Sequence, residues 1–102
     1  MSEKLEFLSE AKADIQAIWQ FLNQEQSQDT ADEIIDRILL ECARLGEMPG
    51  VGHYREDLLD KRYRFWNASS YLIVYQWQVR PIQVIAVVHG ARNLGAFLAN
   101  RV

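Results

Sequence analysis

The sequence predicts an α+β fold in two layers: an N-terminal strand and a helical hairpin packed on a small antiparallel sheet, followed by a short C-terminal helix. Three observations lead to this fold. The first half of the chain holds two stretches whose apolar residues recur at helical spacing. The second half holds three stretches rich in β-branched and aromatic residues. Turn-forming residues separate them, and the length of 102 residues suits one domain over 1–102.

The chain is expected to begin with an edge strand over Leu5–Leu8 and a first helix after it. Ser9 is the predicted N-cap of that helix, because a serine hydroxyl can accept a bond from a free backbone N–H. The apolar stripe then runs to about Asn23. Trp19 belongs to this stripe and is therefore expected in the core.

The second helix is expected after a polar connection over 24–29. Thr30 and Glu33 have the spacing of a capping box, in which a hydroxyl and a carboxylate each satisfy a free backbone N–H. The apolar stripe of this helix ends near Gly46 and Pro49, which are typical stop signals. Each helix needs a partner surface for its stripe, and the sheet supplies it.

The three strands of the second half are predicted at 61–66, 71–77 and 82–88. Turns at 67–70 and 78–81 make them consecutive antiparallel partners. The first of them should present Arg62, Arg64 and Trp66 on one face because side chains alternate along a strand. The short C-terminal helix is inferred from apolar residues at helical spacing: Leu94, Phe97 and Leu98.

Composition limits the possible functions. The hydrophobic share of 49% and the charged share of 25% are ordinary for a globular protein, and no apolar run is long enough to span a membrane. The opening Met1–Lys4 lacks the features of a signal peptide, so we expect a cytosolic protein. A net charge of −3 argues against broad nucleic-acid binding. Cys42, the only cysteine, suits a small buried hydrophobe.

No metal or cofactor is predicted. His53 and His89 are far apart in the sequence, and no carboxylate near either has ligand spacing. The glycines Gly50 and Gly52 follow a helix, whereas a phosphate-binding loop lies between a strand and a helix.

Several short motifs in one order resemble the ParE/RelE superfamily of bacterial toxins from type II toxin–antitoxin systems, and the resemblance covers nearly the whole chain. The arginine after the Pro-Gly junction and the tight helical hairpin are more similar to ParE than to RelE. The motifs are the first-helix segment Ala13–Ile15 with Ile18, the junction Leu45, Pro49, Gly52 and Arg55, the hairpin Arg64 with Tyr71–Tyr75, and the ending His89, Gly90 and Arg92.

The resemblance implies one of two activities. ParE-like members inhibit DNA gyrase, and RelE-like members cleave mRNA on the ribosome. Both are neutralised by an antitoxin, which implies a hetero-oligomer with that partner. The acidic balance of the chain and the absence of a lysine cluster favour a ParE-like gyrase inhibitor without a catalytic site. A family member whose toxicity has decayed is a third reading.

The nuclease alternative would use Arg64, His89 and Arg92, meeting at one end of the sheet. Arginine forks match phosphate oxygens, and a histidine transfers protons near neutral pH. On the binding alternative, the surface for the target or the antitoxin is predicted to use arginines and a tryptophan: Arg55, Arg62, Arg64, Trp66 and Arg92.

Structural roles compete with each of these assignments. His89 can cap the end of a strand by hydrogen bonding, and Arg64 can pair with a helix carboxylate such as Asp14. Arg92 can serve the fold alone. Trp66 and Trp77 are either interface or core residues. The antitoxin segment is expected over an apolar strip between the helical hairpin and the sheet.

Overall fold

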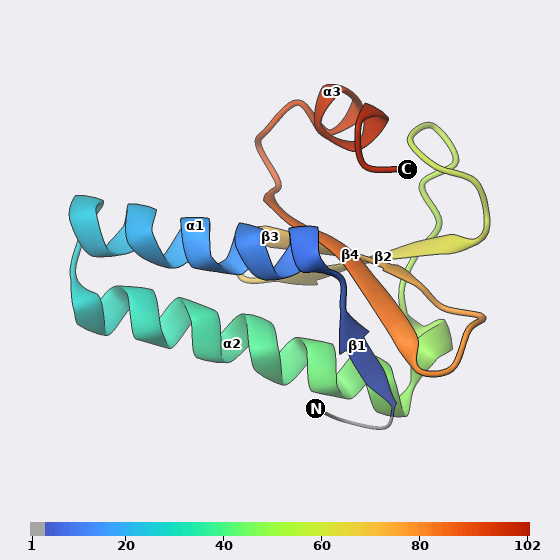
Figure 1. Cartoon of the computed structure of the whole chain (residues 1–102), viewed down its shortest axis with the longest axis horizontal. Coiled ribbons are helices and arrows are strands. Elements are labelled where there is room, and N and C mark those ends of the chain that lie inside the picture. Colours follow the sequence, from blue (N-terminus) through green and yellow to red (C-terminus); the bar gives the residue numbers. More distant parts are fainter. Residues whose placement is uncertain (1–3) are drawn as a thin grey trace.

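The computed structural model describes residues 4–102 and confirms the α+β fold (Figure 1). Residues 1–3, most of the opening that was read for a signal peptide, lie outside this range. No helix among the described residues has the length and apolar run that crossing a membrane requires. The elements in chain order are β1 (Leu5–Phe7), α1 (Ser9–Glu25), α2 (Gln28–Glu47), the 3-10 turn η1 (Pro49–Val51), β2 (Tyr63–Ala68), β3 (Tyr71–Gln76), β4 (Ile82–His89) and α3 (Leu94–Ala99).

The four strands form one sheet in the order β1-β4-β3-β2. The strands β2, β3 and β4 are antiparallel, as predicted. The edge strand β1 runs parallel to β4, with Leu5 opposite Ile82, so the sheet as a whole is mixed. No tight turn joins β1 to β4, and nothing therefore forces that pair to be antiparallel.

The predicted caps of both helices are wrong. Ser9 is the first residue of α1, Leu8 occupies the N-cap position, and no side chain caps this helix. The second helix begins at Gln28, two residues before the predicted Thr30. Its cap is Ser27, whose hydroxyl accepts a hydrogen bond from the backbone N–H of Thr30 at 3.0 Å. The connection between the helices is therefore much shorter than the predicted 24–29, because two hydroxyl residues three apart both fit a cap in sequence.

The first strand of the antiparallel unit begins at Tyr63 rather than Lys61. The carboxylate of Asp60 accepts bonds from the backbone N–H and the guanidinium of Arg62, and this local turn ends only where β2 begins. The alternation predicted for this strand is confirmed: Tyr63 and Phe65 pack on one face, and Trp66 packs against the other.

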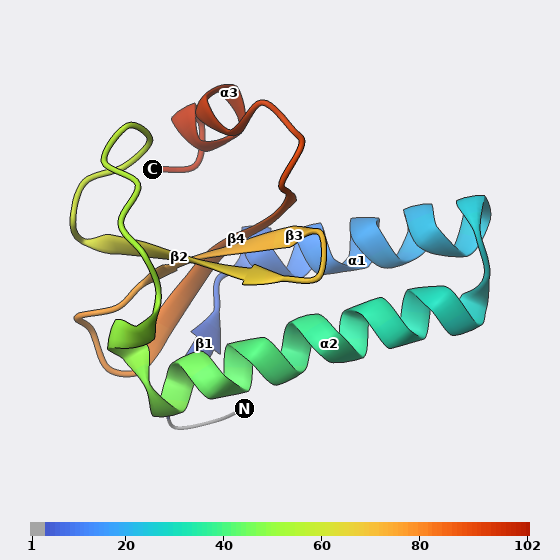
Figure 2. The same ribbon diagram turned by 180° about the vertical axis from the view of Figure 1, so that it is seen from behind.

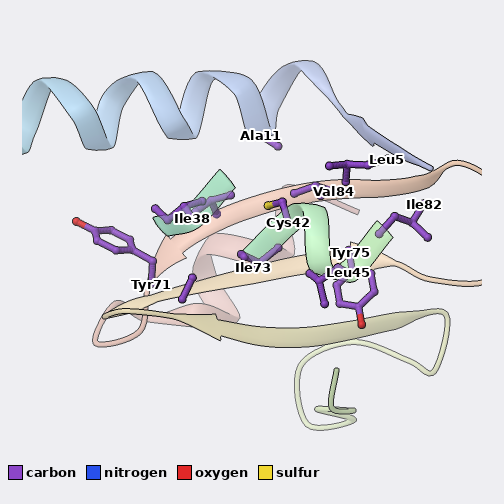
Figure 3. Close-up of a cluster of buried hydrophobic side chains, with 12 residues drawn as sticks. Leu5, Ala11, Ile38, Cys42, Leu45, Tyr71, Ile73, Tyr75, Ile82 and Val84 are labelled. Carbon is purple, nitrogen blue, oxygen red and sulfur yellow. The ribbon is translucent and has the colours of Figure 1, made fainter. Parts of the chain in front are cut away.

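Two apolar clusters sandwich the sheet. The larger lies between the sheet and the helical hairpin, and Figure 3 shows the side chains that α2, β3 and β4 contribute to it. The smaller lies on the opposite face under α3, where Leu98 is buried. Cys42 belongs to the larger cluster, and burial raises the pKa of its thiol to about 12, so it is an inert core residue as predicted.

Trp19 does not lie in either buried cluster, contrary to the prediction. The hairpin extends well beyond the sheet, as Figure 1 shows, and Trp19 lies half-buried along α1. Its indole Nε1–H donates to a carboxylate oxygen of Asp32 on α2 at 2.8 Å. The tryptophan therefore ties the two helices together. A stripe read from sequence cannot show where the sheet beneath a helix ends.

Tyr75 fixes the passage from the helices into the sheet. Its side chain is fully buried, and its hydroxyl donates to the carbonyl of Pro49 at 2.6 Å. The same oxygen accepts from the backbone N–H of Gly52 at 3.1 Å. A side chain at position 52 would meet this hydroxyl, because a Cβ built there lies 2.5 Å from it. The glycine is therefore required by close approach.

We expect Tyr75→Phe to destabilise the protein by about 1–3 kcal/mol, because the buried N–H of Gly52 and carbonyl of Pro49 lose their partner. Urea unfolding measures the loss. Tyr71→Phe is the matched control, since Tyr71 is also a buried tyrosine but makes no such bond within residues 4–102. Equal losses for the two variants would contradict this role of the hydroxyl.

Candidate functional site: a groove between α1, the sheet and α3

The edge of β4 is covered along only part of its length. The short strand β1 pairs with Ile82 to Val84, and the backbone N–H of Leu8 adds a last bond to the carbonyl of Val84 at 3.0 Å. Beyond that point two side chains replace the missing strand. A carboxylate oxygen of Asp14 accepts from the N–H of Val87 at 2.9 Å, and the guanidinium of Arg101 donates to the carbonyl of Ile85 at 2.8 Å. Such capping satisfies groups that a bare edge leaves open.

Asp14 and Arg101 also bind each other through two bonds of 2.9 and 3.0 Å. Their side chains are only 13% and 12% exposed, so the pair is largely shielded from water. The hydrogen bonds that Arg101 donates to Asp14 raise the pKa of its guanidinium. This contact joins α1 to the C-terminal segment across 87 residues of sequence.

A groove of about 530 Å³ opens beside this pair. Its lining comes from α1, from the paired ends of β3 and β4, and from the segment that carries α3. Figure 1 shows α1 and α3 on different sides of the end of β4. The exposed ring of Phe21, with 58% of its surface accessible, forms part of the rim. The lining is mainly apolar and consists of Asp14, Ala17, Ile18, Phe21, Tyr71, Val87, Val88, His89, Arg92 and Phe97.

His89 and Arg92 both lie at this groove. The imidazole is exposed, packs edge-on against Tyr71 with 5.2 Å between ring centroids, and accepts the N–H of Ala91 at Nδ1. That bond closes the end of β4, as the structural alternative predicts. The guanidinium of Arg92 lies 4.9 Å from the ring centroid of Phe97 and has no carboxylate partner among residues 4–102.

Arg64 does not join them, so the expectation that Arg64, His89 and Arg92 meet at one end of the sheet is wrong. Arg64 stands opposite Tyr75 in the β2–β3 ladder, whereas His89 stands opposite Tyr71 in the β3–β4 ladder. Four residues of strand, or about 13 Å, separate these positions. The predicted pair between Arg64 and Asp14 is also absent, because Asp14 binds Arg101.

The remaining predicted binding residues, Arg55, Arg62 and Trp66, have partners within the protein. Arg55 pairs with Asp57, and Arg62 pairs with Asp60, whose pKa this hydrogen bond lowers to about 2. Trp66 packs beside the larger core cluster and stacks on His53, and its indole N–H donates to the buried carboxylate of Glu41 at 2.8 Å. These contacts anchor the sequence-predicted residues in the fold.

The sequence reasoning missed the part played by Phe21, Phe97 and Arg101 in this site. Arg101 stands next to the last residue, and its partner lies at the other end of the chain. The only sequence signal was a carboxylate on the apolar face of a predicted helix at position 14, which calls for a cation. Within residues 4–102 no group of histidine, cysteine, aspartate and glutamate is arranged to hold a metal.

Comparisons with known proteins agree with this architecture. Residues 5–94 match the family model described as the ParE toxin of a type II toxin–antitoxin system. The chain belongs to the ParE toxin family. Toxin ParE1 of Caulobacter vibrioides is 30% identical over 88 residues, which cover 86% of this chain and 90% of that protein. Membership in the ParE family indicates an antitoxin partner.

A solved chromosomal ParDE toxin–antitoxin system from P. aeruginosa has the same fold. The match covers 86% of this chain and 98% of that chain, with a TM-score of 0.72 and 16% identity. At this identity the likeness concerns the ParE fold alone, and functional residues must be argued from the site itself.

We expect Asp14→Asn to destabilise this ParE-family protein by about 2–3 kcal/mol, because the nearly buried Arg101 then keeps only the distant, exposed carboxylate of Glu10 as a counter-ion among residues 4–102. Thermal or urea unfolding measures the loss. Glu10→Gln is the control, since Glu10 lies 3.7 Å from Arg101 with a side chain 63% exposed. It should change the stability by less than about 0.5 kcal/mol. A loss for Asp14→Asn no larger than that of the control would contradict this role of the Asp14–Arg101 pair.

Proposed function

We propose that this ParE-family toxin inhibits DNA gyrase by binding to it and has no catalytic chemistry of its own. Family membership supports a toxin. The observation that favours binding over RNA cleavage is the separation of Arg64 from His89 and Arg92 in the strand register. A nuclease site needs its phosphate-binding cation and its proton donor within reach of one phosphate. The proposal places the protein in the cytoplasm, where gyrase acts on DNA.

The state of Arg64 gives further support. Its Nη1 donates to the carbonyl of Gly52 at 2.7 Å, and its Nη2 lies 3.3 Å from the hydroxyl of Tyr54. Its Nε is buried without a partner. The two terminal nitrogens of the guanidinium are therefore engaged by oxygens of the protein, and its Nε is inaccessible, which disfavours bidentate binding of a phosphate.

We also propose that the antitoxin occupies the groove between α1, the sheet and α3, forming a hetero-oligomer with the toxin. The groove has a mainly apolar lining, and it is large enough to hold one or two apolar side chains of a partner segment. Arg92 supplies a cation at its rim for an acidic residue of that segment. The family resemblance implies an antitoxin segment over an apolar strip between the helical hairpin and the sheet, and the groove, which α1 and the sheet border, is the candidate for that strip.

A supercoiling assay with purified protein tests the target. We expect inhibition of gyrase together with linearised plasmid, and we expect both to disappear when the toxin is first mixed with its antitoxin. Absence of any effect at a large excess of folded protein would contradict the proposal. Cuts in ribosome-bound mRNA would then favour the nuclease alternative, and inactivity in both assays would favour a toxin that has lost its activity.

The groove is tested with Phe21→Glu and its matched control Leu40→Glu. Both side chains are 58% exposed on the helical hairpin, but only Phe21 lines the groove. A carboxylate buried at position 21 in the complex should weaken binding of the antitoxin at least about tenfold, because nothing offsets the free-energy cost of desolvating that carboxylate. The control should stay within about twofold. Isothermal titration calorimetry measures both, and equal effects would place the antitoxin elsewhere.

A further inference from the structure

The cations without a carboxylate partner gather at one place on this acidic chain. Within residues 4–102, ion pairs with aspartate or glutamate engage Lys4, Arg37, Arg44, Arg55, Arg62 and Arg101. The cations for which the described residues provide no such pair are Lys12, Lys61, Arg64, Arg80 and Arg92. Of these, Lys61, Arg64 and Arg80 each contact Trp77, although they come from different segments: Arg64 lies over the ring, and the other two make hydrogen bonds that involve backbone carbonyls.

The contacts with Trp77 are specific. The indole N–H of Trp77 donates to the backbone carbonyl of Lys61 at 3.0 Å, and the backbone carbonyl of Trp77 accepts a hydrogen bond from Nη1 of Arg80 at 3.0 Å. The guanidinium carbon of Arg64 lies 4.1 Å from the ring centroid of Trp77 and 4.3 Å from that of Tyr54. We call Tyr54, Lys61, Arg64, Trp77 and Arg80 the Trp77 cluster.

Arg64 is held as a fixed positive charge at the centre of this cluster. The two aromatic rings enclose it, and its hydrogen bonds go to uncharged oxygens. Aromatic faces and carbonyls stabilise a cation without neutralising it. Lys61 and Arg80 are exposed. The Lys61 ammonium lies 5.7 Å from the ring centroid of Tyr54, and Nη1 of Arg80 donates to the backbone carbonyls of Trp77 and Val79, so both charges face uncharged groups at the surface. The cluster therefore presents uncompensated positive charge on a rigid aromatic base.

The neighbouring acidic groups indicate what kind of anion fits. Asp57 and Asp60 lie on the loop before β2, which also carries Lys61, and they form ion pairs with Arg55 and Arg62. Glu56 is exposed on the same loop. A nucleic acid is a continuous polyanion whose binding relies on many phosphate contacts, and a loop whose acidic and basic residues balance offers few cations for such contacts. Separate carboxylates on a polypeptide can meet separate cations and avoid the aspartates. We propose that the Trp77 cluster is a docking surface for an acidic polypeptide segment of a partner protein.

This surface is distinct from the groove. Trp77 follows the end of β3 at Gln76, whereas the groove lies at the opposite end of that strand, at Tyr71. Six residues of strand, or about 20 Å, separate the two places. Figure 2 shows the β3–β4 turn and η1 close together at one end of the sheet, away from α3, whereas the loop before β2 rises from η1 towards α3. An occupant of the groove would leave the Trp77 cluster accessible, and the inference does not depend on gyrase being the target.

The three tryptophans supply an internal test by NMR. Each indole N–H has a different partner: Asp32 for Trp19, Glu41 for Trp66 and Lys61 for Trp77. A hexaglutamate peptide titrated into ¹⁵N-labelled protein should move the Trp77 indole signal saturably, and less in high salt. The other two signals should stay in place, and hexaglutamine should move none. An unmoved Trp77 signal, or equal shifts for all three, would overturn the proposal.

A short DNA duplex, titrated in the same way, separates the two kinds of polyanion. We expect it to shift the Trp77 signal less than hexaglutamate does at equal charge concentration. A larger shift with DNA would make this a nucleic-acid surface and overturn the assignment to an acidic polypeptide.

Paired variants separate the cluster from net charge. The double variant Lys61→Ala/Arg80→Ala keeps the central Arg64 and should weaken hexaglutamate binding about fivefold, the effect of losing two exposed ion pairs. The control Lys12→Ala/Arg37→Ala removes the same two residue types, both exposed, from the helical hairpin, outside the groove and the Trp77 cluster. It should change the affinity by less than about twofold. Equal weakening by both doubles would mean that only overall charge matters and would overturn the proposal.

Discussion

The ion pair between Asp14 and Arg101 is the contact on which the proposed antitoxin site depends. Because β1 is only three residues long, β4 would otherwise run on with an uncovered edge. Asp14 and Arg101 bond to the N–H of Val87 and the carbonyl of Ile85 on that edge and to each other. The carboxylate thereby fixes the distance between α1 and β4, and the guanidinium holds the C-terminal segment against them. The groove is the space that this arrangement leaves open.

The two ends of the sheet consequently offer different surfaces. At the end near α3, an apolar groove is bordered by His89 and Arg92. At the other end, Arg64 is fixed between two aromatic rings with its charge uncompensated. The fold is shared with relatives of low sequence identity, so the fold cannot decide what each end binds. The side chains at each end carry that information, and a toxin that must bind both an antitoxin and a target has use for two surfaces.

Regular patterns made much of the fold predictable from the sequence. The helical stripes, the β-branched strands and the alternation of Tyr63, Phe65 and Trp66 depend on local periodicity, which sequence displays directly. The contacts that position the site do not depend on local periodicity. Ser27 and Thr30 compete for the same cap, and only the packing of the helices selects one. The pairing of Asp14 with Arg101 spans most of the chain, and the separation of Arg64 from His89 follows from strand register, which no local motif encodes.

We propose that the antitoxin binds between α1 and α3 and leaves the Trp77 cluster free. Hydrogen–deuterium exchange of the toxin, alone and bound to its antitoxin, tests this most directly. We expect slower exchange in α1 around Ile18, at the end of β4 and in the segment that carries Phe97, with little change at the β3–β4 turn. Protection confined to the loop before β2 and to the β3–β4 turn, with the groove unchanged, would contradict it.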